Sequence, residues 1–146
     1  MTISEKLIEK YGDPTKDLKV FEARNMVLWD IPSYINAAIP ALPNRLYCNK
    51  DLIHPLSQSF ENLKETGYDK ELKTWDGCFN IRKKRGSKST SLHSWGIAID
   101  LNSAWNGFGK TPTLSPEFVK CFTDAGFDWG GNFGRLDGMH FQLAKI

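Results

Sequence analysis

Apolar residues recur at helical spacing in three segments of the chain, near residues 3–11, 54–66 and 116–125. Such a spacing of three and four residues places the side chains on one helical face, so each segment is predicted to be an amphipathic helix. A glycine follows each segment and provides the expected end. The predicted buried faces are Ile3, Leu7, Ile8 and Tyr11; Leu56, Phe60 and Leu63; and Phe118, Val119 and Phe122.

Proline and capping residues mark where two of these helices begin. Ser115, Pro116 and Glu117 are typical of a helix start: a capping hydroxyl, a proline at the first helical position, and an acid near the positive end of the helix dipole. Pro55 suits the first turn of the segment 54–66, because the N–H that proline lacks would have no intrahelical acceptor there. Local chemistry therefore supports the predicted helix starts.

Short strands are predicted between and after these helices. Met26–Trp29 and Leu46–Cys48 are apolar, Leu72–Trp75 precedes a basic segment, and Ile97–Asn102 and Met139–Leu143 alternate between two faces. Because helices and strands mix without a regular strand–helix alternation, we expect an α+β fold with a small, mostly antiparallel sheet flanked by helices.

Length and composition fit one domain. A chain of 146 residues is long enough to bury a core, and 40% hydrophobic and 25% charged residues are ordinary for a soluble globular protein. No internal repeat or low-complexity linker divides the chain. We therefore expect a single domain over residues 1–146, with residues 1–28 as an N-terminal extension packed on it, and a monomer.

Cysteines and charges narrow the class of protein. Cys48, Cys78 and Cys121 are odd in number and form no CxxC pair, so neither a disulfide framework nor a cysteine zinc site is predicted. The net charge of +2 does not require an anionic polymer as partner. Basic residues cluster at 82–88, which is compatible with nucleic acid, with an anionic substrate or with a solvated loop. One short basic segment is not a basic face, so nucleic acid is not expected as a partner.

Neither the N-terminus nor any apolar run indicates export or membrane insertion. Met1–Lys10 alternates charged with apolar residues and has no apolar signal-peptide core. The longest uncharged run, Ile31–Asn44, is too short to span a membrane and contains three prolines. We expect a protein made in a host cytoplasm without a signal peptide.

Two of the three histidines lie in organised surroundings, and His93 is the first of them. Downstream of it, Asp100 lies in an alternating strand among apolar residues, where an unpaired carboxylate is costly and requires a cation. His93 has the opposite parity to Asp100, so a straight strand would separate them. Gly96 lies between the two, and a bend or bulge there would bring both side chains into one site.

The second histidine lies in the segment Asp137–Leu143. His140 falls on the polar side of the predicted strand, and the preceding turn presents Asp137. Two imidazoles and one carboxylate form a common catalytic zinc triad, which leaves the fourth position for water. A base must still accept the proton of that water. We therefore predict a metal site formed by His93, Asp100 and His140, with Asp137 as the base.

These motifs resemble those of a known enzyme family, and the resemblance extends to Trp75–Arg82 and Gly126–Gly131. The motifs are Ser91-x-His93-x-x-Gly96-x-Ala98-x-Asp100 and, further along, Asp137-x-Met139-His140-Phe141. They resemble the zinc D-alanyl-D-alanine carboxypeptidase and L-alanyl-D-glutamate endopeptidase family. The resemblance implies a Hedgehog/D,D-peptidase-like fold, one zinc ion, and hydrolysis of peptide bonds in the peptidoglycan stem peptide.

The resemblance also implies roles for individual residues. It implies that His93, Asp100 and His140 bind zinc and that Asp137 acts as the catalytic base. The family has an arginine that polarises the scissile carbonyl or holds a substrate carboxylate; Arg82 is the best match and Arg85 the alternative. A guanidinium directed at a developing oxyanion is worth about 3 kcal/mol of barrier. Ser91 matches a serine that orients the substrate, and Trp129, beside two glycines that permit close approach, is expected to contact it.

The small single-domain form resembles phage-encoded members that act as endolysins or virion lytic enzymes. This favours cleavage between L-alanine and D-glutamate over removal of terminal D-alanine, and predicts action on the bacterial cell wall after release or virion delivery. Two alternatives stay open at this point. One is a non-catalytic wall-binding or virion module in which zinc is structural, and the other is a structural role for each motif residue, such as an Asp-Gly turn at Asp137.

Overall fold

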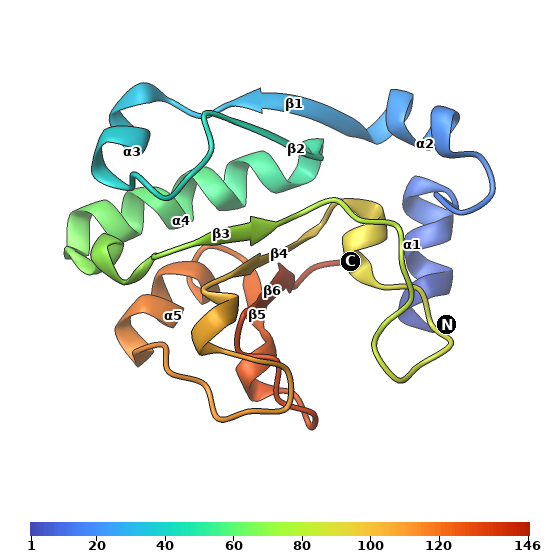
Figure 1. Ribbon diagram of the computed structural model, residues 1–146. Coiled ribbons are helices and arrows are strands. Elements are labelled where there is room, and N and C mark those ends of the chain that lie inside the picture. Colours follow the sequence, from blue (N-terminus) through green and yellow to red (C-terminus); the bar gives the residue numbers. More distant parts are fainter.

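Two antiparallel sheets and one long helix organise the fold (Figure 1), as seen in a computed structural model that describes residues 1–146. The smaller sheet pairs β1 (Met26–Asp30) with β2 (Arg45–Asn49), and the long helix is α4 (Ile53–Thr66). The larger sheet has four strands in the order β3 (Trp75–Gly77), β4 (Ala98–Leu101), β6 (His140–Leu143) and β5 (Phe127–Trp129), all antiparallel to their neighbours. The predicted α+β class with small antiparallel sheets flanked by helices is confirmed.

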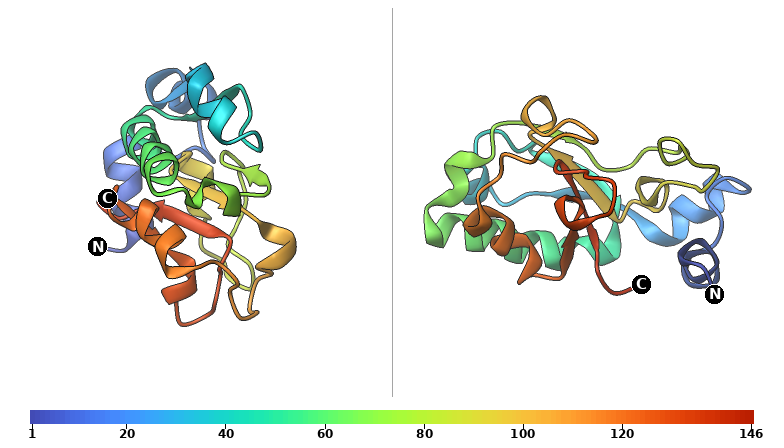
Figure 2. Two further views of the ribbon diagram at one scale, coloured as in Figure 1. Left: turned by 90° about the vertical axis from the view of Figure 1, so that its left-hand side faces the viewer. Right: turned by 90° about the horizontal axis from the view of Figure 1, so that it is seen from below.

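The two N-terminal helices, α1 (Ile3–Tyr11) and α2 (Leu18–Asn25), lie at one end of the molecule (Figures 1 and 2). Gly12 ends α1 with a φ of 89°, as its position predicted. The indole N–H of the buried Trp95 donates to the Gly12 carbonyl at 3.0 Å. This hydrogen bond ties the N-terminal helices to the second half of the chain.

Helix α4 packs between the two sheets. Its Phe60 stacks on Trp29 of β1, with ring centroids 6.3 Å apart, and meets Trp75 of β3 edge-on at 6.0 Å. The Asn62 side chain donates to the Cys121 carbonyl of α5 (Pro116–Thr123) at 3.0 Å. A fully buried apolar side chain, such as that of Phe60, stabilises the fold by about 1.5–3 kcal/mol. The predicted apolar faces of α4 and α5 are buried, whereas in α1 only Leu7 and Tyr11 are buried and the predicted burial of Ile3 and Ile8 is wrong.

The strands of the larger sheet position the chemistry-bearing residues. Asp100 of β4 lies directly opposite His140 of β6 in the strand register. Side chains along β4 and β6 alternate between the two faces of the sheet, as predicted. Ile99 and Phe141 are fully buried on one face, and Asp100 and His140 lie on the other.

Two short helices were not predicted. Helix α2 buries only Phe21 and Asn25, so its apolar periodicity is too weak to recognise. Helix α3 (Ser33–Ala38) follows directly on Pro32 within the run that contains three prolines. Proline is compatible with a helix start because its fixed φ already suits the first turn.

Two predicted boundaries were displaced. The strand expected over Leu72–Trp75 begins only at Trp75, because the backbone N–H groups of Lys73 and Thr74 donate to the Asn102 side chain instead of to a strand. Helix α5 (Pro116–Thr123) begins at the predicted cap and proline but ends before Gly126. The three cysteines are free and buried, and no helix is both long and apolar enough to cross a membrane.

Candidate metal centre

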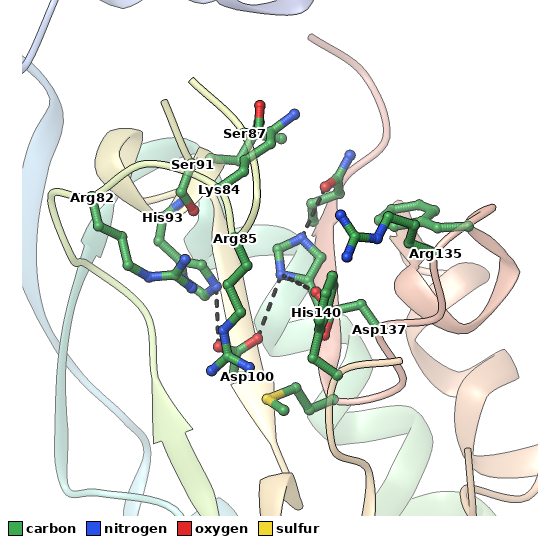
Figure 3. A pocket seen from close by; sticks show the side chains of 15 residues that line it. Arg82, Lys84, Arg85, Ser87, Ser91, His93, Asp100, Arg135, Asp137 and His140 are labelled. Carbon is green, nitrogen blue, oxygen red and sulfur yellow. Dashed lines mark hydrogen bonds and ion pairs between the residues drawn. The ribbon is translucent and has the colours of Figure 1, made fainter. Parts of the chain in front are cut away.

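His93, Asp100 and His140, here called the metal cluster, converge on a cavity of about 300 Å³ (Figure 3). One potential ligand atom from each residue lies within 4.8 Å of the others. Asp100 and His140 come from paired strands, whereas His93 comes from a different kind of element. The structure therefore brings together the three side chains that the sequence predicted as ligands.

A short 3-10 turn carries His93, and Gly96 ends it. The turn spans Leu92–Trp95, and Gly96 has a φ of 70°, in the left-handed region that favours glycine. A Cβ at Gly96 would also lie 2.7 Å from the Met26 sulfur and 2.9 Å from the Asn49 backbone nitrogen. The predicted bend at Gly96 is confirmed, but a bulge within a continuous strand is wrong, because the strand begins only at Ala98.

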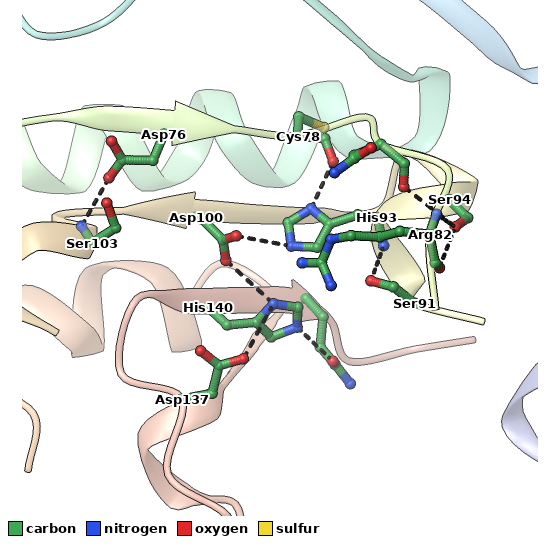
Figure 4. A network of polar contacts seen from close by, with 12 residues as sticks. Asp76, Cys78, Arg82, Ser91, His93, Ser94, Asp100, Ser103, Asp137 and His140 are labelled. Carbon is green, nitrogen blue, oxygen red and sulfur yellow. Dashed lines mark hydrogen bonds and ion pairs between the residues drawn. The ribbon is translucent and has the colours of Figure 1, made fainter. Parts of the chain in front are cut away.

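Hydrogen bonds fix which nitrogen each imidazole turns toward Asp100 (Figure 4). His93 Nδ1 lies 2.6 Å from the Cys78 carbonyl, which can only accept, so Nδ1 carries the proton and Nε2 presents its lone pair. His140 Nε2 lies 2.9 Å from Gln142 Oε1, which leaves the Nδ1 lone pair facing the cluster. Metal-binding histidines typically have such an outer hydrogen bond on the nitrogen that does not ligate.

The cluster contains two lone pairs directed at an anion. His93 Nε2 is 3.2 Å and His140 Nδ1 is 3.4 Å from the Asp100 carboxylate. His93 Nε2 is buried without a hydrogen-bond partner, since its contact with Asp100 lacks hydrogen-bond geometry. A buried polar atom of this kind is costly unless something satisfies it. A shared cation would satisfy all three groups, and this set of two nitrogens and one carboxylate is a donor set that zinc accepts.

Electrostatics keep Asp100 ionised in these surroundings. Burial raises the pKa of the Asp100 carboxyl, but His140 and His93, when they are protonated in place of a bound cation, outweigh it and hold the pKa well below its usual value. Burial likewise lowers the pKa of His140, and the hydrogen bond and negative charge of Asp100 more than reverse that change. Asp100 is thus an anion that attracts positive charge into the cluster.

Asp137 lies beside the cluster without belonging to it. Its Oδ2 is 3.9 Å from His140 Nδ1, and 24% of its side chain is exposed to the cavity side. Its backbone N–H donates to the Gly130 carbonyl at 3.0 Å, and a Cβ at Gly130 would collide with the Asp137 carbonyl. Partial burial raises the pKa of Asp137, although the positive charge of His140 opposes this. Such a carboxylate is a stronger base than an ordinary one.

The arginines and the serine predicted for the site all line the cavity. The backbone of Arg82 is fixed by hydrogen bonds to Ser94 and Ser91, and its half-buried side chain lies near His93 in Figure 4. Arg85 lies on the exposed part of the same loop. Ser91 is buried, and its hydroxyl accepts from the His93 N–H at 3.3 Å, so it caps the turn that carries this histidine.

Trp129 does not line this cavity, in contrast to its predicted contact with substrate. Its indole stacks on Phe141, with ring centroids 6.4 Å apart, and its N–H donates to the Gly138 carbonyl at 2.8 Å. Gly138 directly follows Asp137, so Trp129 holds the turn that presents this carboxylate. The glycines beside Trp129 permit close packing of the chain, since a Cβ at Gly130 would meet Asp137 and one at Gly131 would meet the Trp129 ring.

Sequence reasoning missed three side chains at the rim of the cavity: Phe108, Phe133 and Arg135. They lie in loops outside every helix and strand, where no periodicity marks a residue as inward or outward. The Phe133 ring lies 6.1 Å from the ring of His140. The available signal for Arg135 was its position two residues before Asp137, but only the fold shows that its side chain lines the cavity.

Comparison with known families adds one match. Residues 85–143 match a family model described as D-alanyl-D-alanine carboxypeptidase. The matched segment begins at Arg85 and contains the metal cluster and Asp137, but it covers less than half of the chain and excludes Trp75–Arg82. Comparisons with curated proteins and with solved structures gave no significant match. The family match supports a hydrolase of the peptidase class.

Proposed function

We propose that this protein is a zinc-dependent peptidase that hydrolyses the bond between L-alanine and D-glutamate in the peptidoglycan stem peptide. One observation carries the proposal. Three potential ligands meet at the cavity with their lone pairs and negative charge directed inward, and a partly exposed carboxylate stands next to them without completing the set. This arrangement suits a catalytic site, whereas a structural zinc site would have a fourth protein ligand.

The metal cluster would hold the ion through His93 Nε2, His140 Nδ1 and the Asp100 carboxylate. When bound, zinc supplies a Lewis acid that polarises the scissile carbonyl and acidifies the attacking water. The Cys78 carbonyl and the Gln142 side chain keep the two imidazoles in the required tautomers and orientations.

Asp137 and Arg82 provide the remaining chemistry. Asp137 accepts the proton of the attacking water at its carboxylate and then donates it to the leaving amine. Its raised pKa favours the first transfer, because a stronger base accepts the proton more readily, and its conjugate acid is still acidic enough to protonate an amine. Arg82 donates hydrogen bonds to the oxygen that becomes negative in the transition state, and its anchored backbone favours it over Arg85 for this role.

The direct test combines metal analysis with digestion of purified muropeptides. The purified protein is expected to contain one zinc per chain and to release peptides, to stop when a chelator removes the metal, and to resume when zinc is restored. Tight zinc binding without released peptides would contradict the proposal and indicate a non-catalytic module.

Removal of terminal D-alanine is the second candidate, and the description of the matched family favours it. Mass spectrometry of the products separates the two activities. The endopeptidase releases fragments that begin with D-glutamate, whereas the carboxypeptidase shortens the stem by a single D-alanine. Both outcomes use the same metal cluster.

We further propose that the enzyme acts on the bacterial cell wall as a phage lysis or virion enzyme. The protein added from outside should clear a suspension of permeabilised cells whose wall contains the susceptible bond. Failure to lower turbidity, with soluble muropeptides still cleaved, would argue against a lytic role and leave the peptidase activity intact.

A further inference from the structure

The cavity contains more positive charge than the chain itself neutralises. Its only carboxylates are Asp100, which is engaged by two histidines, and Asp137. No ion pair joins any of the four basic side chains that line the cavity to a carboxylate. An unneutralised positive cavity attracts anionic ligands. The four basic side chains are Arg82, Lys84, Arg85 and Arg135.

Two of these cations are held on one aromatic ring. The guanidinium carbon of Arg85 lies 5.6 Å and that of Arg135 lies 5.1 Å from the ring centroid of Phe108. The three residues come from three different loops, and Figure 3 shows the two arginines on separate loops facing the cavity. Arg135 also packs tightly against the backbone at Gly86, where a Cβ would be 3.0 Å from its Nη1. We call Arg85 and Arg135 on this ring the arginine pair.

Such an arrangement favours an anion between the loops. The ring stabilises each guanidinium through a cation–π contact, yet the two positive charges repel one another. The attraction of a bound anion to each guanidinium would offset that repulsion. The planar fork of a guanidinium fits the two oxygens of a carboxylate, and hydrogen bonds of this kind are charge-assisted.

We propose that the arginine pair is a carboxylate subsite, which binds a free carboxylate of the substrate at a distance from the scissile amide. This inference rests on the proposed peptidase function and goes beyond it, because it names what the loops select. A stem peptide offers the carboxylate in two places: the free carboxylate of its D-glutamate, and the carboxyl end of the peptide. Arg82 is separate from this subsite, since its backbone is fixed near His93.

Three synthetic stem peptides test the subsite with the zinc-loaded enzyme. One has all its carboxylates free, one is amidated at the D-glutamate, and one is amidated at the C-terminus. For the unmodified protein, amidation of the recognised carboxylate should lower kcat/KM roughly 10- to 100-fold, the range for losing charged hydrogen bonds. The affected peptide identifies which carboxylate binds.

The same ratio is then measured in Arg135→Gln, Arg85→Gln and a control, Arg24→Gln. Arg24 is exposed on α2 and lies outside the cavity, so its substitution removes the same charge elsewhere. Either substitution in the arginine pair should bring the acid-to-amide ratio close to one, whereas the control should retain it. Arg135→Lys should recover only part of the ratio, because lysine keeps the charge but not the fork.

Cleavage and peptide affinity, measured together, distinguish failure of this inference from failure of the proposed function. If the unmodified protein cleaves peptides but neither substitution changes the ratio, the subsite is wrong and the peptidase stands. If it cleaves none of the three peptides, the proposed function fails, and calorimetry with the same peptides decides on the subsite. Equal affinity for acid and amide peptides in the unmodified protein would then overturn it.

Discussion

The metal cluster and the arginine pair face the same cavity, but the fold builds them in opposite ways. Asp100 and His140 are paired across neighbouring strands and lie mostly buried, whereas Arg85 and Arg135 are exposed on loops. Strand pairing and hydrogen bonds hold the metal cluster in place, while one shared ring organises the arginine pair.

This contrast indicates that the two regions have different tasks, one to hold a metal and the other to recognise a charged group. Groups that hold a metal need accurate placement, which regular backbone and outer hydrogen bonds provide. Recognition of a charged group tolerates more movement, and loops carry such recognition in many folds. Substitutions in the metal cluster should therefore abolish activity, whereas those that only loosen the site should have graded effects.

The largest effect is expected for Asp100→Asn, which removes the anion at the centre of the metal cluster while preserving its shape. Two lone pairs would then meet a neutral amide, so zinc content should fall, and hydrolysis should drop by roughly 1,000-fold or more because the metal contributes several kcal/mol. Elemental analysis and muropeptide digestion measure both. Asp128→Asn on the exposed side of β5 is the matched control, and normal zinc content in Asp100→Asn would refute the cluster.

The next largest effect is expected for Asp137→Ala, which changes a residue that lies beside the metal cluster without belonging to it. The variant should keep its zinc, because Asp137 lies outside the set of ligands, but hydrolysis should fall about 100- to 10,000-fold through loss of the base. Rates and zinc content are measured together, with Asp128→Ala as control. Unchanged hydrolysis would remove Asp137 from the mechanism.

A smaller effect is expected for Gln142→Leu, which removes the outer hydrogen bond of His140 but no ligand. Zinc affinity should fall about 10- to 100-fold, because the ring loses its fixed tautomer and orientation. Competition with a chromogenic chelator measures the affinity. Gln58→Leu on the exposed side of α4 is the control, and equal affinities would mean that strand pairing alone orients the ring.

The smallest effect is expected for Trp129→Phe, which keeps the stacking on Phe141 but loses the hydrogen bond to Gly138. One hydrogen bond is worth about 1 kcal/mol, so kcat should fall up to about fivefold while KM stays constant. Steady-state kinetics distinguish this from substrate contact, which would raise KM instead. Trp105→Phe, at an exposed indole outside the cavity, is the control.

The sequence by itself determined most of the local structure and the identity of the metal cluster. Period-two alternation placed Asp100 and His140 on the polar faces of their strands, and Ser115 with Pro116 marked the start of α5. These signals succeed because strand alternation and helix caps depend on residues close together in the chain. Where such signals were weak, as in α2, the element was missed.

Only the tertiary structure decided how these pieces meet. The register that sets Asp100 opposite His140, the turn that carries His93, and the ring that joins Arg85 to Arg135 all depend on contacts between distant segments. Trp129 shows the same limit, because its glycine neighbours indicated a ligand while the fold uses it to hold the turn after Asp137. Loop residues carry no periodicity, so their partners become visible only when the chain has folded.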